Sequence, residues 1–137
     1  MRPVTPITRA LLALAGLLAT ALIAVGLRPW DALAQCGTTY TVHVGPSGTF
    51  TYSPSSLTIK VGDSVKWVFD TSGHTVTSGT SCTADGRFCS PNDTNCASGA
   101  TSGAGATYQH TFKTAGTFRY FCATHCAFNM AGSVTVQ

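Results

Sequence analysis

The sequence predicts an all-β protein, a β-sandwich of Greek-key type, and three observations support this class. Thr, Val and aromatic residues dominate the second part of the chain, while Gly, Ser, Pro and Asn separate the apolar segments. Several short segments alternate apolar and polar residues with a period of two. No segment shows a convincing helical period. Short strands joined by regular turns are typical of two packed sheets.

Residues 1–34 are predicted to be a signal peptide. Two arginines precede an uncharged run over 11–27, and Ala-Leu-Ala at 32–34 supplies the small-x-small pattern of a cleavage site. Two alternatives remain open. The run is just long enough to be an uncleaved membrane anchor, and the residues around Cys36 resemble a lipobox in which Cys36 would carry a lipid. All three readings place residues 35–137 outside the cytoplasm, in the periplasm, secreted or anchored on the outer face.

Residues 35–137 have the size of one small domain, with a core large enough to fold alone. This part of the chain carries five Lys and Arg residues against four Asp residues, which leaves a net charge of +1. Nothing resembles a basic stripe, so we expect no nucleic acid partner, and no acidic patch is visible. A partner would have to be recognised mainly by shape and apolar contact.

Alternation of apolar and polar residues places the strands. It indicates strands over 57–61 and 65–69, with Gly62 and Asp63 at the turn, so that a hairpin with one inward face is expected. The same pattern recurs at Tyr108 to Phe112, at Phe118 and Tyr120, and at Val134 and Val136.

Residues 79–106 are predicted to form a long polar loop, with a flexible segment from Gly99 to Ala106. Cys82, Cys89 and Cys96 interrupt this loop at equal spacings of seven. A long loop with little apolar content is costly to order, so cross-links in an oxidising compartment make physical sense here.

Three potential metal ligands stand close together after the strand that contains Phe118 and Tyr120. Cys122, His125 and Met130 have the spacing C-x2-H-x4-M. Two imidazoles and a thiolate near one plane, with a weak axial thioether, suit copper that passes between two oxidation states. Because Phe118, Tyr120 and Cys122 are in phase along the strand, the thiol should point into one end of the sandwich.

The second imidazole must come from elsewhere in the chain. His43 and His110 both lie within predicted strands, at ordinary strand positions. His74 follows a glycine and begins a strand in phase with Val76, which leaves its ring free at the sheet edge. We therefore predict His74 as the remaining ligand.

The ligand spacing resembles that of the cupredoxins, the type 1 blue copper proteins, in the form found in plastocyanin and pseudoazurin. The resemblance covers nearly all of the chain after residue 38, through Leu57–Trp67, Gly73–Val76, Gln109–Phe112, Gly116–Cys122 and Gly132–Val136. It implies a cupredoxin-like copper-binding domain over residues 35–137. One copper ion would be held by His74, Cys122, His125 and axial Met130, and the protein would be an electron carrier rather than an enzyme.

The resemblance also implies how partners dock. In this family the residue equivalent to His125 exposes its ring edge through an apolar patch, where Ala127 and Phe128 would lie. The partners would then be other redox proteins that dock there transiently. The family commonly has Asn after the upstream His, where it helps to tie the two ligand loops together. Here Thr75 occupies that place, and its hydroxyl would have to replace the tie.

Cys126 departs from the family pattern. The spacing Cys122-x3-Cys126 is that of the binuclear copper centre of oxidase electron-entry domains. Because such a centre also needs a His where Met130 stands, a disulfide is the better interpretation of Cys126. Five cysteines then remain besides Cys122, so one must be free, lipidated or paired to another chain. If Cys36 is lipidated, the other four would form two bridges, and we expect Cys89 with Cys96 and Cys82 with Cys126.

Two further functions remain open. A copper delivery or storage module would favour several exposed, exchangeable Met and His ligands, and Met130 is the only methionine after Met1. An immunoglobulin-like structural domain with disulfides would account for the fold, but it would leave the C-x2-H-x4-M spacing to chance.

Overall fold

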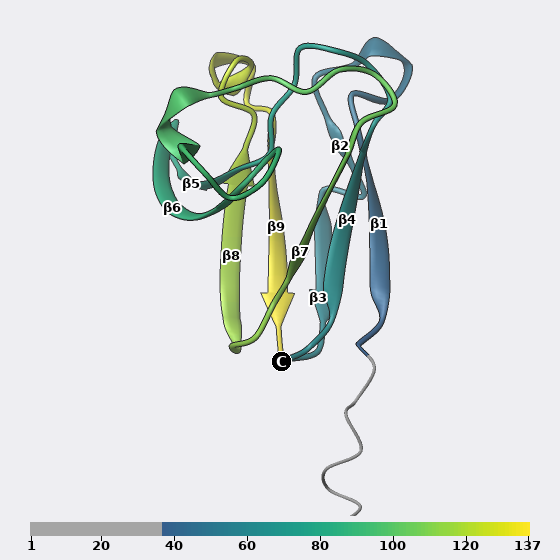
Figure 1. Ribbon diagram of the computed structural model, residues 1–137, viewed down its shortest axis with the longest axis vertical. Coiled ribbons are helices and arrows are strands. Elements are labelled where there is room, and N and C mark those ends of the chain that lie inside the picture. The colour runs from purple at the N-terminus through teal and green to yellow at the C-terminus, as the bar shows by residue number, and fades with distance from the viewer. Residues whose placement is uncertain (1–36) are drawn as a thin grey trace, which may run out of the picture. The chain divides into compact units, whose positions relative to one another are not determined.

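The computed structural model describes residues 37–137, which form two β-sheets packed as a sandwich (Figure 1). The four-stranded sheet has the order β2-β1-β4-β7, with β1 (Thr39–Val44), β2 (Tyr52–Ser53), β4 (Ser64–Phe69) and β7 (Thr107–Thr111). The five-stranded sheet has the order β3-β9-β8-β5-β6, with β3 (Ser56–Ile59), β9 (Ala131–Val136), β8 (Gly116–Phe121), β5 (Thr77–Thr80) and β6 (Thr83–Cys89). The prediction of an all-β sandwich is confirmed.

Helical structure in the described part of the chain is limited to three single turns of 3-10 helix, η2 (Pro46–Gly48), η3 (Cys96–Ser98) and η4 (Cys126–Phe128). Within residues 37–137, no helix has the length and apolar character needed to cross a membrane. The predicted signal peptide, its cleavage site and Cys36 lie outside the described residues.

The predicted hairpin of residues 57–61 and 65–69 is wrong. β3 pairs in parallel with β9, and β4 pairs in parallel with β1, so these consecutive strands belong to different sheets. The connection crosses from one sheet to the other at Gly62, which has a φ of 95°. The carboxylate of Asp63 then accepts the backbone N–H groups of Lys60, at 2.8 Å, and of Thr38, at 2.7 Å. The backbone N–H of Asp63 also donates to the carbonyl of Lys60 at 3.0 Å, so residues 60–63 form a tight turn, and the bond to Thr38 ties this turn to the start of β1.

Alternate side chains of both sheets fill the core, as the period of two requires. Trp67 lies at its centre, fully buried, with ring centroids 5.4 Å from both Tyr108 and Tyr120 and 5.8 Å from Phe88. The remaining side chains of this core come from five strands, β1, β2, β3, β4 and β9, and from connections, and include Val42, Val44, Tyr52, Ile59, Val65, Phe69, Val76, Phe112, Val134 and Val136.

The expected long loop over residues 79–106 is only partly correct, because this segment contains all of β6. β6 pairs with β5 as a hairpin at the edge of the five-stranded sheet, with an irregular register between Thr77 and Gly79. Only Phe88 and Cys89 of β6 are buried. An edge strand with two adjacent buried residues has no alternation to detect, which explains the error.

Two disulfides have the connectivity expected from the sequence, Cys89 with Cys96 and Cys82 with Cys126. The first closes the short connection after β6. The second joins the β5–β6 turn to η4 within the β8–β9 connection. Cys122 is the one free cysteine among residues 37–137, and it is buried.

Candidate metal centre

The β1–β2, β4–β5 and β8–β9 connections lie at the same end of the sandwich, at the top of Figure 1. His74 lies in the β4–β5 connection, while Cys122 directly follows β8 and His125 comes three residues later. The two Nδ1 atoms of His74 and His125 are 3.1 Å apart. Sγ of Cys122 lies 3.8 Å from Nδ1 of His74 and 3.5 Å from Nδ1 of His125. The fold thus brings His74 next to Cys122, 48 residues later in the chain, and to His125, 51 residues later.

These three donor atoms fit a single metal ion. They all lie within 4.8 Å of one another. Nitrogen and sulfur ligands bound at about 2.0–2.3 Å around one ion stand about 3–4 Å apart, which is the separation of these three atoms. Imidazole and thiolate are also the donors that suit copper.

The hydrogen bond on the far side of His74 fixes which ring nitrogen is free. Nε2 of His74 lies 3.1 Å from the hydroxyl oxygen of Thr71. That hydroxyl donates its only proton to the carbonyl oxygen of Gly45, at 3.0 Å, so it must accept the N–H of Nε2. The unprotonated Nδ1 of the neutral ring therefore faces Cys122 and His125. Burial, and then repulsion from His125, lowers the pKa of His74, which also favours the neutral ring.

Cys122 is 0% exposed, and two contacts position its sulfur. The backbone N–H of Thr75 donates to Sγ at 3.3 Å. The hydroxyl of Thr124 lies 3.1 Å from Sγ and donates to the carbonyl of Gly73 at 2.7 Å. The thiol is therefore held against the β4–β5 connection, as the in-phase position with Tyr120 predicts.

Met130 closes the ligand loop through its backbone. Its carbonyl accepts the N–H of Cys122 at 3.0 Å, and its own N–H donates to the carbonyl of His125 at 3.4 Å. The side chain is almost fully buried in the same apolar cluster as Cys122. The structure thus brings Met130 to the base of the loop, and its role as axial ligand stays a prediction.

Thr75 ties the two ligand loops together from the place where the family commonly has Asn. Its side chain is buried, and Oγ1 accepts the backbone N–H of Ala123 at 2.8 Å. The carbonyl of Thr75 accepts the hydroxyl of Tyr52 at 2.6 Å. A second tie comes from the disulfide between Cys126 and Cys82. Because that bond occupies the sulfur of Cys126, this residue supplies no second thiolate, and the binuclear alternative is wrong.

The other candidate histidines lie outside the group of three donor atoms. His43 on β1 places Nδ1 3.0 Å from Oδ1 of Asp70, and His110 on β7 places Nδ1 3.4 Å from Oδ2 of Asp93. The expectation that His74 begins a strand is wrong, however, because β5 starts at Thr77. His74 forms an isolated bridge with Ser102, so the segment expected to be flexible pairs with it.

Phe50 is a site residue that sequence reasoning missed. Its ring stacks on the ring of His125, with centroids 4.0 Å apart and planes at 14°, and lies 5.1 Å from the ring of Phe128. Phe50 is 43% exposed and Phe128 is 66% exposed. We call Phe50, His125 and Phe128 the aromatic cap. The only available signal was an isolated aromatic residue in a polar turn, which is weak.

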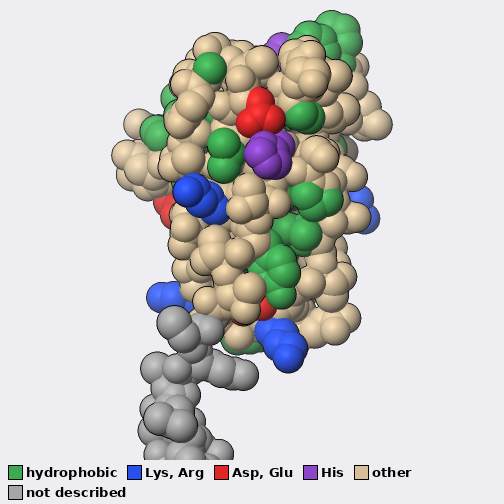
Figure 2. Space-filling view, turned by 90° about the vertical axis from the view of Figure 1, so that its right-hand side faces the viewer, with side chains coloured by type: hydrophobic (Ala, Val, Ile, Leu, Met, Phe, Trp, Pro, Cys, Tyr) green, Lys and Arg blue, Asp and Glu red, His purple; other side chains and the backbone are tan. Residues whose placement is uncertain are grey.

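Figure 2 shows the cap end and the flank beside β1. Hydrophobic side chains gather next to a histidine at the upper end, whereas positive and negative side chains on this flank are few and scattered. The picture on this face agrees with the low net charge of residues 35–137. A partner at this end would meet apolar surface rather than a field of one sign.

Comparison with known proteins also indicates a copper-binding protein. A family described as copper binding proteins of the plastocyanin/azurin family matches residues 39–137. A plastocyanin from Scenedesmus fuscus is 36% identical over 108 residues, which cover 71% of this chain and 98% of that protein.

Solved structures share the fold. A purple cupredoxin from Nitrosopumilus maritimus is 27% identical, with a TM-score of 0.55 over 71% of this chain and 98% of its own. A copper-containing nitrite reductase from Thermus scotoductus is 22% identical, with a TM-score of 0.54 over 72% of this chain but only 22% of its own, which shows the fold alone. These matches confirm the cupredoxin resemblance and the copper cofactor. The chain whose donor atoms meet at one end of this sandwich belongs to the plastocyanin/azurin family of copper binding proteins.

Proposed function

We propose that this protein is an electron carrier that holds one copper ion through His74, Cys122, His125 and Met130. The observation that carries the proposal is the convergence of two Nδ1 atoms and one Sγ atom from two connections far apart in sequence. When bound there, copper supplies one-electron chemistry between Cu(I) and Cu(II).

The surrounding residues suit such a carrier because they restrict movement of the donor atoms. Thr71 and Gly45 fix the ring of His74, and Thr75 holds both the sulfur of Cys122 and the backbone of Ala123. Donor atoms that are fixed in this way change little when the charge of a bound ion changes, so little reorganisation accompanies electron transfer.

Burial of the donors argues against the alternative of copper delivery or storage. His74, Cys122 and Met130 are each buried, and only His125 is partly exposed. A module that hands its metal to another protein needs donors that the receiving ligands can reach. Four protein ligands would also leave no open position for a substrate, which is why we propose a carrier and not an enzyme.

The aromatic cap is the proposed docking surface for redox proteins. Phe50 and Phe128 flank His125, and Ala127 is exposed beside them. The patch is apolar and includes the one ligand that is partly exposed, so a docked partner would approach the metal closely. A small contact area suits brief encounters between redox proteins.

We further propose that the domain works in the periplasm or as a secreted protein, possibly held on the outer face by an uncleaved anchor or by lipid on Cys36. Two disulfides support this location, because such bonds form and persist in oxidising compartments. The pattern of a signal peptide in residues 1–34 supports it as well.

Visible and electron paramagnetic resonance (EPR) spectra of the purified protein after addition of Cu(II) test the proposal. We expect an intense thiolate-to-copper band, one copper per chain and a reversible one-electron wave in voltammetry. Cys122→Ser should lose the band, whereas the matched control His43→Gln, outside the donor cluster, should keep it. Absence of the band, or its survival in Cys122→Ser, would refute the assignment. Rapid passage of copper to a chelator would favour the delivery module instead.

A further inference from the structure

A chain of oxidisable rings leads away from the candidate metal centre through the core. It begins at Tyr52, whose hydroxyl donates to the carbonyl of Thr75, while the N–H of Thr75 donates to Sγ of Cys122. The ring centroids of Tyr52 and Tyr120 are 4.8 Å apart. Those of Tyr120 and Trp67 are 5.4 Å apart, and those of Trp67 and Tyr108 are 5.4 Å apart. We call Tyr52, Tyr120, Trp67 and Tyr108 the aromatic chain.

Aromatic packing alone would be satisfied by phenylalanine at these four positions, and the hydroxyls of Tyr52 and Tyr108 make hydrogen bonds besides. All four side chains are buried, and a buried phenol or indole carries a polar group that a phenylalanine would avoid. Indole Nε1 of Trp67 is buried without a hydrogen-bond partner. Tyr and Trp are, however, the aromatic side chains that lose an electron most readily. Because consecutive rings are nearly in contact, an electron can move from one ring to an oxidised neighbour.

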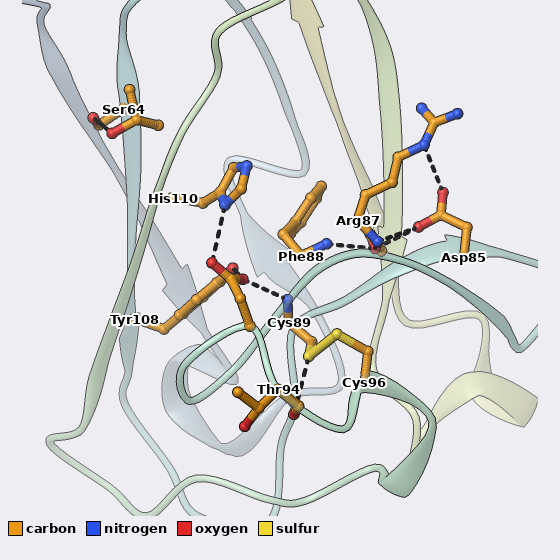
Figure 3. Close-up of polar contacts among 12 residues, drawn as sticks. Ser64, Asp85, Arg87, Phe88, Cys89, Thr94, Cys96, Tyr108 and His110 are labelled. Carbon is orange, nitrogen blue, oxygen red and sulfur yellow. Dashed lines mark hydrogen bonds and ion pairs between the residues drawn. A yellow bond between two sulfur atoms is a disulfide. The ribbon is translucent and has the colours of Figure 1, made fainter.

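The far end of the aromatic chain has a proton acceptor. The hydroxyl of Tyr108 donates to Oδ1 of Asp93, which also accepts the backbone N–H of Cys89 at 2.9 Å. Oδ2 of Asp93 lies 3.4 Å from Nδ1 of His110. Figure 3 shows Tyr108 and His110 on β7 and the backbone of Cys89 on β6 turned toward one place. The carboxylate is 44% exposed, so a proton that it receives can pass to water.

Protonation of the resting state suits this role. Burial, and then the hydrogen bond to Asp93, raises the pKa of Tyr108, so the phenol keeps its proton while it is reduced. Loss of an electron makes a phenol strongly acidic, and the hydrogen-bonded carboxylate is then placed to take the proton.

We propose that Tyr108 is a redox-active tyrosine. The aromatic chain connects it to the metal centre, and Asp93 accepts its proton. This goes beyond electron transfer at the aromatic cap. An oxidised centre could also take an electron from Tyr108, which lies at a second surface, the flank formed by β7 and the connection after β6. The proposal depends on the proposed copper site in one respect: oxidation begins there.

Hydrogen peroxide is an oxidant for which the step balances. It takes up two electrons and two protons, breaks its O–O bond and gives two molecules of water. Copper held by His74, Cys122, His125 and Met130 would supply one electron through the partly exposed ring of His125, so peroxide need not occupy a ligand position. Tyr108 supplies the other electron along the aromatic chain, through Trp67, Tyr120 and Tyr52. The phenolic O–H of Tyr108 breaks, and its proton passes to Asp93 and on to solvent, which leaves a neutral tyrosyl radical. Two protons are drawn from solvent for the water formed, and a small reductant such as ascorbate later returns one electron and one proton to Tyr108.

Freeze-quench EPR after mixing the Cu(I)-loaded protein with hydrogen peroxide tests the proposal. We expect a tyrosyl radical signal beside the Cu(II) signal, and its loss in Tyr108→Phe. Trp67→Phe should also lose it, because the relay is broken, and Asp93→Asn should delay it. The matched control Tyr40→Phe, a half-buried tyrosine outside the aromatic chain, should keep the full signal, and protein loaded with Zn(II) should give none.

A second readout measures protection of the ligands by peptide mass spectrometry. Peroxide should oxidise Cys122 and Met130 more extensively in Tyr108→Phe than in the unchanged protein. A radical signal of full size in Tyr108→Phe or in Trp67→Phe would overturn the proposal, as would an equal loss in Tyr40→Phe. Should one variant fail to fold, Asp93→Asn alone decides, because an unchanged time course there would overturn the role of the carboxylate. The Cu(II) band, recorded first, reports separately on the proposed copper site.

Discussion

Removal of the Cys82–Cys126 disulfide should weaken both the fold and the retention of copper. The bond joins the β5–β6 turn to η4, which lies between His125 and Met130 in the ligand loop. The double variant Cys82→Ala/Cys126→Ala removes this bond. The double variant Cys89→Ala/Cys96→Ala is the matched control, because it removes the other bond and leaves the ligand loop untouched.

The expected loss of stability follows from the lengths of the two closed loops. Cys82 and Cys126 are 44 residues apart, and Cys89 and Cys96 are 7 residues apart. Loop closure in the unfolded chain then gives a loss of about 4 kcal/mol for the first pair and about 2.4 kcal/mol for the second. Denaturant unfolding of the copper-free proteins measures both values. A loss below about 1 kcal/mol in Cys82→Ala/Cys126→Ala would contradict the entropic reasoning.

Copper retention separates the local effect from the global one. Without its bond to Cys82, η4 is free to move relative to the β5–β6 turn, and His125 and Met130 on either side of it move as well. Transfer of copper to an excess of chelator should therefore be faster in Cys82→Ala/Cys126→Ala than in the control variant, compared at a temperature where both are folded. Equal rates in the two variants would refute a role for this disulfide in holding the ligand loop.

Three further predictions concern other contacts of the centre and core. Thr75→Val should lower the unfolding free energy by about 1–3 kcal/mol, because the N–H of Ala123 loses its acceptor. Thr75→Ser keeps a hydroxyl acceptor, so it should keep most of the stability of the unchanged protein in the same denaturant assay. Thr71→Val should weaken copper binding about 10–100-fold in chelator competition, since the N–H of His74 Nε2 is left without its acceptor, and Thr71→Ser should not. Burial raises the pKa of three phenols, to about 12 for Tyr120, so above pH 10 the unfolded chain loses protons that the folded protein keeps. Stability is therefore full below pH 10 and should fall, as pH rises toward 12, by up to about 4 kcal/mol per pH unit, a slope that Tyr120→Phe should reduce by about a third in denaturant unfolding.

The sequence was sufficient for the features that depend on local pattern and on distinctive chemistry. A period of two determines which side chains face inward, which is why the sandwich and the inward thiol of Cys122 could be predicted. Imidazole, thiol and thioether groups are rare enough that their spacing carries information. The position of His74 after a glycine singled it out among the histidines, and the family resemblance gave the same ligand set. Setting Cys122 and Cys36 aside left four cysteines for two bridges, a count that does not choose among the three possible pairings, and the pairing we expected is the one observed.

Features that depend on which segments meet in space could not be predicted in this way. Alternation in residues 57–61 gives the inward face of β3 but not its neighbour, and β3 pairs with β9 from the far end of the chain. Asp63 decides the path of the connection through a bond to Thr38, which no local pattern reveals. Phe50 is likewise ordinary within its own turn, and its place in the aromatic cap depends on stacking against the ring of His125, which is distant in sequence.

Thr75 shows how one residue can serve the metal centre and the core together. Its backbone N–H contacts Sγ of Cys122, its hydroxyl accepts from Ala123, and its carbonyl accepts from Tyr52. The first two contacts join the ligand loops, and the third leads to the aromatic chain. Two of the three involve only the backbone, so they do not depend on the side chain at this position. A hydroxyl can therefore replace the amide that the family commonly carries here, provided that it keeps the one side-chain bond of this position, to the N–H of Ala123. The disulfide between Cys82 and Cys126 adds a further tie to the loop that contains Cys122 and His125.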